Sequence, residues 1–285
     1  MASLNEIKKR IKVIESTSKI TNAMKLVATS KLKKQKDAFA KTNDFYKSFY
    51  KIFSIAYHDS QLKLILNKNT SNNTLWIVFT SSMGLCGGYN LNIVKELKNN
   101  IKENDVIILF GRKGSSIIKN KQINNEIILQ VDIDDKNLNF DICDLLCQKV
   151  VEDYYADKYQ NIKIIYMKFI NSITFEPTIF SLLPLDDKLK DKLEKPVGGG
   201  YFKVEPSPES LLKKMLPKYL ATCVYGALVE GKISENASRR NAMDGATKNA
   251  NDLMVNYKLE FNRIRQSDIT QEITEIISGS RSGGE

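Results

Sequence analysis

Glycine and proline are distributed very unevenly along this chain of 285 residues. The first glycine is Gly84, and all six prolines lie between Pro177 and Pro217. Because these two residue types disfavour a helix interior more than any others, a long stretch without them permits one very long helix. The distribution therefore predicts a long helix at each end of the chain and a differently built segment between them.

The first long helix is predicted to begin near Ser3 and to end near His58. Ser3 and Glu6 match a capping box, which is typical of a helix start. Apolar residues then recur in steps of three and four, the spacing of a coiled-coil contact stripe. This stripe is expected to comprise Leu4, Ile7, Ile11 and Ile14, to pass through Ser18 and Thr21, and to resume at Ile20, Met24 and Val27. At about 1.5 Å per residue, such a helix spans roughly 80 Å.

The second long helix is predicted from Glu209 to Ser278, despite three internal glycines, because glycine is tolerated where two backbones approach closely. Its expected stripe comprises Leu212, Leu216, Tyr219, Cys223, Ala227, Met243, Ala246, Ala250, Leu253, Tyr257, Phe261 and Ile264. Neither long helix would be stable alone in water, so each needs the other or an enclosing partner. The simplest arrangement pairs them antiparallel.

Between the two helices, the apolar pattern changes to short runs that are typical of buried strands. The predicted strands are 75–80, 106–110, 126–131 and 162–169, with an edge strand at 178–183. The predicted intervening helices are 92–102, 114–120 and 140–159, and 195–208 is expected to form a loop. Alternation of strand and helix predicts a mainly parallel sheet with helices on its faces, a Rossmann-like doubly wound α/β domain.

The predicted fold class is thus α/β plus a long antiparallel α-helical coiled coil, with the N- and C-terminal helices paired. Three parts are expected. Residues 1–60 form the N-terminal coiled-coil helix, residues 61–206 the central α/β domain, and residues 207–285 the C-terminal coiled-coil helix.

The chain carries 43 basic and 33 acidic side chains, a net charge of +10. Such an excess favours an acidic partner, which could be nucleic acid, an anionic membrane surface or an acidic protein face. Ten of the basic side chains lie in residues 1–36, against only Glu6 and Glu15. This basic helix lacks the interleaved aromatic residues expected of a nucleic-acid binder, so a basic shaft facing an acidic protein fits at least as well.

The glycine-rich stretch TSSMGLCGGYN, residues 80–90, follows a predicted strand and precedes a predicted helix. A phosphate-binding loop occupies this position in many α/β proteins. The spacing matches neither GxGxxG nor GxxxxGK[ST], and no lysine stands at the helix start. The stretch is therefore predicted to be a tight turn with close backbone packing, with a nucleotide-binding α/β enzyme as the alternative.

Residue types that carry catalysis or metal binding are sparse. The single histidine, His58, is predicted to be a solvated helix residue, and the acidic loop from Asp132 to Asp135 lacks the rest of a calcium-loop pattern. Cys143 and Cys147 are expected to be small buried hydrophobes on one helix face. No catalytic residue, cofactor or metal site is predicted.

No segment approaches the roughly 20 apolar residues that a membrane span requires, and the charged amino terminus has no apolar signal core. The chain is expected to be a soluble intracellular protein with no direct membrane span.

Both ends of the chain closely resemble the F-type ATP synthase gamma family. The matching stretches are ASLNEIKKRIKVIESTSKITNAMKLVATSKLKK at 2–34, NASRRNAMDGATKNA at 236–250 and NRIRQSDITQEITEIISG at 262–279. TSSMGLCGGYN is similar to the TSDRGLCGG turn of that family. Ser82 and Met83 replace the usual Asp-Arg pair, which would remove an ion-pair contact from this turn, and Gly279-Ser280 replaces a usual Gly-Ala.

The resemblance implies a non-catalytic rotor shaft. In that family the paired helices occupy the axis of a hexameric ring of alternating alpha and beta subunits, and the α/β domain binds the epsilon subunit and the membrane rotor ring. The implied location is cytoplasmic, peripheral on the inner face of the cell membrane as part of the complex.

The resemblance also implies partner-contact residues. Met24 and Lys25 match positions that face an acidic lever of a beta subunit. Arg265 and Gln266 match a pair that grips a beta catch loop. The positions tied to coupling efficiency are matched by Thr270, Glu272 and Glu275.

Two rival functions stay open at this point. The same terminal motifs would serve the shaft of a related F-type ATPase that drives an apparatus other than proton translocation. A basic coiled-coil nucleic-acid-binding protein is the alternative from another class, and it predicts tight, salt-sensitive binding of DNA or RNA.

Overall fold

The structure is a computed structural model that describes residues 4–58, 70–133, 139–184 and 207–282. The predicted Ser3 cap, the loop at 195–206, and Asp134 and Asp135 lie outside the described residues, as do the side chains of His58 and Leu212. Two compact units are present, one made of residues 1–29 with 240–285 and the other of residues 30–239.

Two long helices dominate the chain, as predicted. Helix α1 spans Leu4–His58 with 55 residues, and helix α7 spans Pro208–Ser282 with 75 residues. Pro217 lies inside α7 and removes one backbone hydrogen-bond donor. The adjacent Leu216, Tyr219 and Leu220 are fully buried, and this packing holds the helix together at that point.

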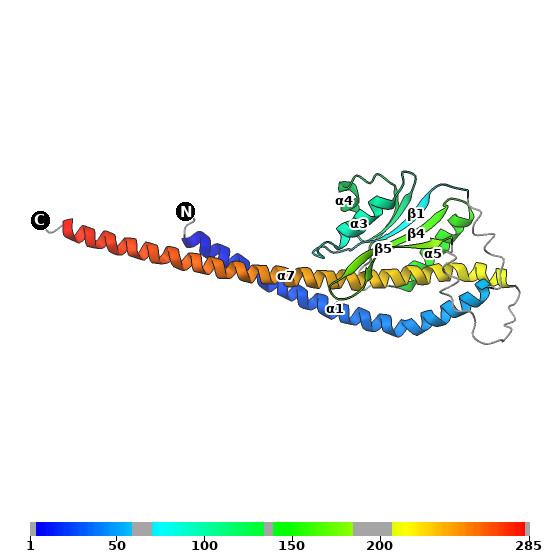
Figure 1. Ribbon diagram of the computed structural model, residues 1–285, viewed down its shortest axis with the longest axis horizontal. Coiled ribbons are helices and arrows are strands. Elements are labelled where there is room, and N and C mark those ends of the chain that lie inside the picture. Colours follow the sequence, from blue (N-terminus) through cyan, green and yellow to red (C-terminus); the bar gives the residue numbers. More distant parts are fainter. Residues whose placement is uncertain (1–3, 59–69, 134–138, 185–206, 283–285) are drawn as a thin grey trace. The chain divides into compact units, whose positions relative to one another are not determined.

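A five-stranded sheet lies in the second unit, in the order β3-β2-β1-β4-β5 (Figure 1). The strands are β1 (Thr74–Phe79), β2 (Val106–Phe110), β3 (Ile127–Val131), β4 (Asn161–Phe169) and β5 (Phe175–Leu183). The first four pair in parallel, and β5 pairs antiparallel with β4 at the edge. The connecting helices are α3 (Tyr89–Asn100), α4 (Lys113–Asn120) and α5 (Phe140–Tyr155). The predicted doubly wound α/β architecture is confirmed, with boundary shifts of a few residues.

Each face of the sheet has its own core. On one face, Trp76, Val78 and Ile165 pack against buried residues of α3 and α4. On the other face, Leu75, Ile77 and their neighbours pack against α5 and the first part of α7. The residues of β1 and β2 are almost all apolar on both faces because both faces are covered there.

A buried carboxylate ties the starts of β1 and β2 together. Asp105 accepts hydrogen bonds from the backbone N–H of Thr74 at 2.7 Å, from the Trp76 indole at 2.9 Å and from the Lys102 N–H at 2.9 Å. Such a charged acceptor is stable inside a protein only when it is bonded in this way. It fixes where the sheet begins.

The contact stripe of α1 differs from the prediction in its middle. Ile20 and Val27 are 58% and 55% exposed, so the stripe does not resume at these residues. Instead the alternation of three and four continues through Ser18, Thr21 and Lys25 to the buried Ala28. Helix geometry, rather than hydrophobicity, decides the face, because a residue two positions from Ser18 points away from the partner helix.

The stripe of α7 differs in one place. Leu253 is 49% exposed, whereas the neighbouring Met254 is half-buried. Steps of four and three from Ala250 reach Met254 and Tyr257, so a strict seven-residue repeat is maintained. The prediction of Leu253 was wrong because it followed the more apolar of two adjacent residues.

Within the described ranges, no helix contains a stretch that is both long enough and apolar enough to cross a bilayer.

Candidate functional site

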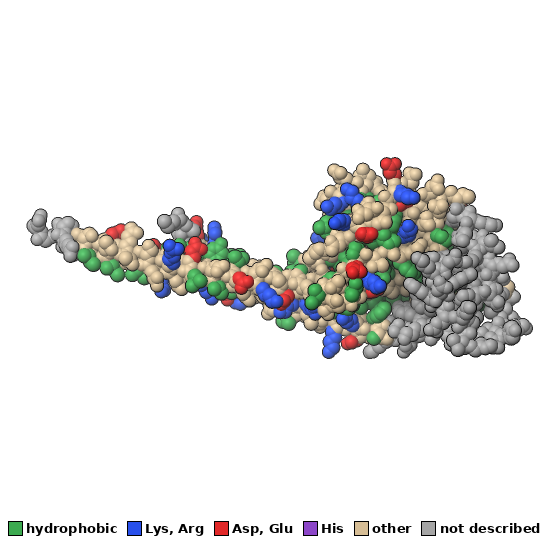
Figure 2. Space-filling view, in the orientation of Figure 1, with side chains coloured by type: hydrophobic (Ala, Val, Ile, Leu, Met, Phe, Trp, Pro, Cys, Tyr) green, Lys and Arg blue, Asp and Glu red, His purple; other side chains and the backbone are tan. Residues whose placement is uncertain are grey.

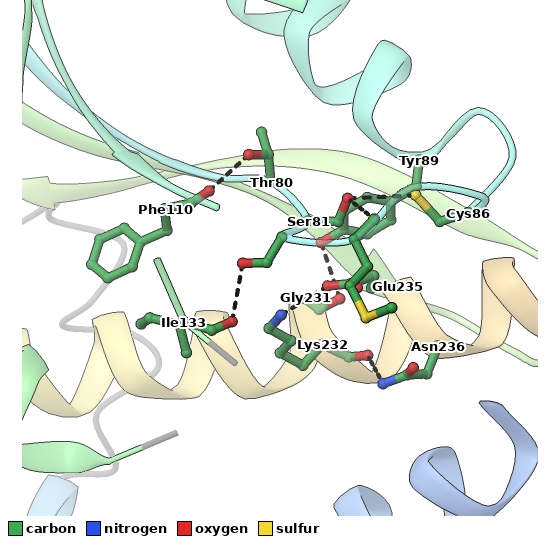
Figure 3. Close-up of polar contacts among 12 residues, drawn as sticks. Thr80, Ser81, Cys86, Tyr89, Phe110, Ile133, Gly231, Lys232, Glu235 and Asn236 are labelled. Carbon is green, nitrogen blue, oxygen red and sulfur yellow. Dashed lines mark hydrogen bonds and ion pairs between the residues drawn. The ribbon is translucent and has the colours of Figure 1, made fainter. Parts of the chain in front are cut away.

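The turn after β1 packs on helix α7 within the second unit (Figure 3). The Tyr89 hydroxyl donates to the Gly231 carbonyl at 3.0 Å, and the Ser238 hydroxyl donates to the Cys86 carbonyl at 2.7 Å. Inside the turn, the Ser81 N–H donates to the side-chain oxygen of Asn90 at 2.8 Å. The turn is thereby rigid and attached to α7, which confirms the predicted close packing.

A buried ionic trio on α7 completes this junction. Glu235 lies 3.0 Å from the Lys232 ammonium and 2.6 Å from the Arg239 guanidinium, and all three side chains are buried. Arg239 also donates to the backbone carbonyls of Met83 and Gly84, at 3.2 and 3.3 Å. Because a buried charge is tolerated only when it is paired and hydrogen-bonded, the trio and the turn depend on each other.

Two glycines of this junction lie in tight surroundings. Gly111 has φ +90°, and an added Cβ would lie 2.3 Å from the Thr80 carbonyl oxygen. At Gly231 an added Cβ would meet the Tyr89 hydroxyl at 3.3 Å. The second glycine therefore allows the turn to approach the helix backbone, as expected. The same expectation is wrong for Gly226 and Gly245, because no atom lies within 4 Å of their Cβ positions.

The turn keeps its shape without the Asp-Arg pair that is usual in the resembling family. The Ser82 hydroxyl donates to Asp132, and the Arg112 guanidinium lies 3.0 Å from the other oxygen of that carboxylate. The Met83 side chain is exposed, and only its carbonyl takes part in the junction. An Asp132-centred contact thus holds this part of the turn.

Cys143 and Cys147 are fully buried in the core between α5 and α7, as predicted for small hydrophobes. Burial raises the pKa of the Cys143 thiol to about 12 and raises the pKa of the Cys147 thiol well above its usual value. Both groups stay protonated at neutral pH and are poor nucleophiles or ligands. Among the described residues, no cluster of three or more histidine, cysteine or acidic side chains is arranged to hold a metal ion.

The two long helices contact each other directly in the first unit. Ser18 donates to Asn251 at 2.8 Å, Thr21 and Thr247 share a hydrogen bond of 2.7 Å, and Lys25 pairs with Asp244 at 3.1 Å. Along α1 the residue numbers increase, whereas the residue numbers of their partners in α7 decrease. The pairing is therefore antiparallel, as predicted.

Met24 and Lys25 lie in this paired region and are half-buried. The Lys25 ammonium is occupied by Asp244, which also contacts Lys248 at 3.0 Å. These two cations lower the pKa of Asp244, with the Lys248 hydrogen bond as the larger cause. The sequence did not indicate Asp244, because a charged residue next to the apolar stripe is usually a solvated surface residue.

The other five predicted contact residues lie farther along α7 and are all exposed. They are Arg265, Gln266, Thr270, Glu272 and Glu275. Every described side chain from 265 to 278 is exposed, and four isoleucines among them form an apolar stripe: Ile269, Ile273, Ile276 and Ile277. In the space-filling view, hydrophobic side chains lie along the surface near the end of α7 (Figure 2).

The predicted contact residues thus form two separate groups. From Asp244 to Arg265 the helix advances by roughly 30 Å. Lys25 lies beside Asp244, so the pair Met24 and Lys25 and the five residues of α7 do not share one site. Arg239, which sequence reasoning passed over as a site residue, was signalled only by its place in the motif NASRRNAMDGATKNA.

Comparison with known proteins extends over the whole chain. The model of the ATP synthase family matches residues 3–282. An ATP synthase gamma chain from Malacoplasma penetrans is 55% identical over 284 residues, which cover 99% of each chain. This chain belongs to the ATP synthase gamma chain family. A gamma chain from Ureaplasma parvum serovar 3 is 40% identical, over 98% of this chain and 99% of its own length.

Solved structures agree with the gamma family assignment. A chain in the central stalk and c-ring structure of the Tetrahymena thermophila mitochondrial ATP synthase is 28% identical, with a TM-score of 0.58, over 80% of this chain and 99% of that chain. A chain of the Euglena gracilis mitochondrial ATP synthase is 19% identical, with a TM-score of 0.69, over 98% of this chain and 94% of its own. At that identity the second likeness shows the fold alone.

Proposed function

We propose that this gamma family member is the central rotor shaft of an F-type ATP synthase and performs no catalysis itself. The observation that carries the proposal is membership of the family over residues 3–282, together with an antiparallel helix pair of the kind a shaft requires. The shaft couples its rotation to nucleotide-state changes in a hexameric ring of alternating alpha and beta subunits.

The coupling follows from symmetry. One asymmetric helix pair cannot make equivalent contacts with three identical catalytic sites at once. Its orientation therefore biases each site towards a different nucleotide state through differential contacts. Turning the shaft changes which site releases product, and ATP hydrolysis turns the shaft in the opposite direction.

The exposed end of α7 supports a partner that encloses it. The segment from 265 to 278 buries none of its described side chains, although four of them are isoleucines. An isolated helix of this length is marginal in water, and apolar residues aligned along one helix favour contact with a protein surface. The inside of a subunit ring supplies such a surface.

The contact residues are assigned roles within this proposal. Met24 and Lys25 face the acidic lever of a beta subunit. Arg265 and Gln266 grip a beta catch loop, since a guanidinium can make two parallel bonds to a carboxylate. The residues that tune coupling are Thr270, Glu272 and Glu275.

The central domain and the location of the chain also belong to the proposal. In this proposal the chain has three parts, residues 1–60, 61–206 and 207–285. The epsilon subunit and the membrane rotor ring bind the central part. The Tetrahymena relative is described in a central stalk with a c-ring, and the Euglena relative in an assembly of OSCP, F1 and c-ring. This chain would accordingly lie at the inner, cytoplasmic face of the cell membrane, attached through its complex.

The test is purification of the tagged full-length chain from its own cells, followed by quantitative mass spectrometry. We expect three alpha and three beta subunits for each copy of the chain, together with epsilon and a membrane rotor ring. A hexameric ring recovered with another apparatus in place of the rotor ring would support the non-proton-translocating alternative. Recovery without any ring ATPase would contradict the proposal.

A further inference from the structure

The contact stripe between α1 and α7 becomes polar in the middle of the first unit. Over about two helical turns, the successive stripe positions of α1 are Ser18, Thr21 and Lys25, all half-buried. On either side the stripe is apolar, with Ile14 before this segment and Ala28 after it. An ordinary coiled coil would continue with apolar residues here.

Each of these polar side chains bonds to α7. The Thr21 and Thr247 hydroxyls lie 2.7 Å apart, and either can be the donor. Each hydroxyl also lies within hydrogen-bonding distance of a carbonyl of its own helix, Thr21 at 3.1 Å from Ser18 and Thr247 at 2.8 Å from Met243. Ser18 with Asn251 and Lys25 with Asp244 flank this central pair.

Polar pairs and apolar pairs respond differently when one helix slides along the other. Isoleucines can find new apolar partners after a shift of one turn, about 5.4 Å. The three polar pairs would all lose their partners together, because each depends on a single residue of α7. Polar residues in a coiled-coil stripe are known to specify register at a cost in stability.

We propose that these three pairs, Ser18 with Asn251, Thr21 with Thr247 and Lys25 with Asp244, form a register lock that fixes the axial position of α7 against α1. The lock residues are positioning residues. Under the proposed function, the lock determines how far Arg265 and Gln266 extend into the ring. The lock itself is a property of the isolated chain, so it can be tested independently of the complex.

Lys25 belongs to the lock and is also a proposed contact with a beta subunit. In the free chain, the Lys25 ammonium is paired with Asp244, which leaves the side chain only 31% exposed. A substitution at Lys25 therefore alters the helix pairing in addition to any contact with a beta subunit. Exchange of the two charges separates these effects, because it restores the pair and reverses the charge that a partner would meet.

The experiment measures register in the full-length chain by double electron-electron resonance. Spin labels are attached at Lys9→Cys and Asn249→Cys, which are exposed and lie in the paired part of the two helices, while the native cysteines are buried. The variant without the lock carries Ser18→Ala, Thr21→Val, Lys25→Met and Thr247→Val, which preserve side-chain size. A matched control, Ile11→Val with Ile14→Val, loosens the apolar stripe instead.

We expect one narrow distance distribution for the parent chain and for the apolar control. The variant without the lock should keep its helix content but show a second population. In this population one helix is displaced along the other by about one turn, roughly 5 Å. Lys25→Asp should broaden the distribution, and adding Asp244→Lys should narrow it again. A single, unchanged distribution in the variant without the lock would overturn the proposal, whatever the chain is found to assemble with.

Discussion

At the scale of the single residue, Glu235 is a buried carboxylate beside the turn after β1. It is buried between Lys232 and Arg239, and Arg239 in turn holds two carbonyls of the turn. Two cations would stay behind in a dry environment if the carboxylate were removed. Glu235 therefore neutralises two buried cations and also holds Arg239 in the position from which it bonds to the turn.

We expect Glu235→Ala to lower the free energy of unfolding by about 3–5 kcal/mol, the usual cost of removing one partner from a buried ion pair. Chemical denaturation of the full-length chain measures this difference. The matched control is Glu15→Ala, which breaks the exposed pair with Lys19 and should change stability little. A similar small effect at both positions would show that the buried trio does not support the fold.

Glu230 is expected to make the stability of the fold depend on pH. The stabilisation should decrease as pH rises, whereas that from a carboxylate in an ordinary salt bridge increases. It accepts a hydrogen bond from the Phe169 N–H at 3.1 Å. Burial raises the pKa of this carboxyl, while the Phe169 amide and the Tyr166 hydroxyl oppose the shift. Since the folded state binds the proton more tightly than the unfolded state, the contribution of Glu230 to stability falls as pH rises from the unfolded pKa, near 4.5, through the folded pKa.

Glu230→Gln should remove this dependence, because glutamine keeps an acceptor oxygen and carries no charge. Relative to the variant, the parent chain should lose stability as the pH rises from about 4.5 towards neutrality. Thermal unfolding of both proteins at several pH values measures the difference. Parallel stability curves would contradict the assigned cause.

At the scale of the element, α7 contains glycines with different surroundings. No atom lies within 4 Å of the Cβ position of Gly226, whereas the corresponding position of Gly231 meets the Tyr89 hydroxyl at 3.3 Å. That hydroxyl is itself bonded to the Gly231 carbonyl, so a shift away from an added methyl group would disturb this bond. One helix therefore contains a glycine in open surroundings and a glycine in tight surroundings.

We expect Gly226→Ala to stabilise the chain by up to about 1 kcal/mol, the difference in helix propensity between the two residues. Gly231→Ala should destabilise it, because the methyl group disturbs the turn. In a Tyr89→Phe background, the effect of Gly231→Ala should become less unfavourable, since the hydroxyl is gone. Urea unfolding of the four variants measures these effects, and equal changes at both glycines would contradict the packing argument.

The end of α7 carries the proposed contact with the ring. Arg265→Ala should leave the unfolding temperature of the isolated chain unchanged, because the side chain is exposed and alanine favours helix. In purified ring complexes, the same change should weaken assembly or lower the rotation-linked ATPase activity. Arg263→Ala, an exposed arginine on the same helix, is the control for loss of one positive charge. Unchanged activity of the Arg265 variant would count against its proposed role.

For the whole molecule, folding and assembly should be separable. Residues 265–278 bury no described side chain, so removing everything after Ile264 should not alter the unfolding temperature of the chain. Retention of the truncated chain by the alpha and beta ring should weaken, with a fall in rotation-linked ATPase activity. Calorimetry and gel filtration of the complex measure the two properties. A large drop in unfolding temperature would show that this segment packs within the chain.

The sequence by itself determined the two long helices, the strand and helix alternation and the strand positions to within a few residues. These features depend on local properties, namely where glycine and proline occur and with what period apolar residues repeat. The motifs at both ends likewise indicate the family, because they can be read from the residues alone. The five exposed residues on α7 came from that resemblance, and no local pattern would have selected them.

Only the tertiary structure decided which side chains meet. Lys25 and Asp244 are 219 residues apart, and Arg239 lies 156 residues from the Met83 carbonyl that it holds. Periodicity places a residue on a helix face, but the axial register between two helices depends on every contact along them. For this reason the pattern favoured Ile20, Val27 and Leu253 for the stripe, whereas the packed helices use Lys25, Ala28 and Met254.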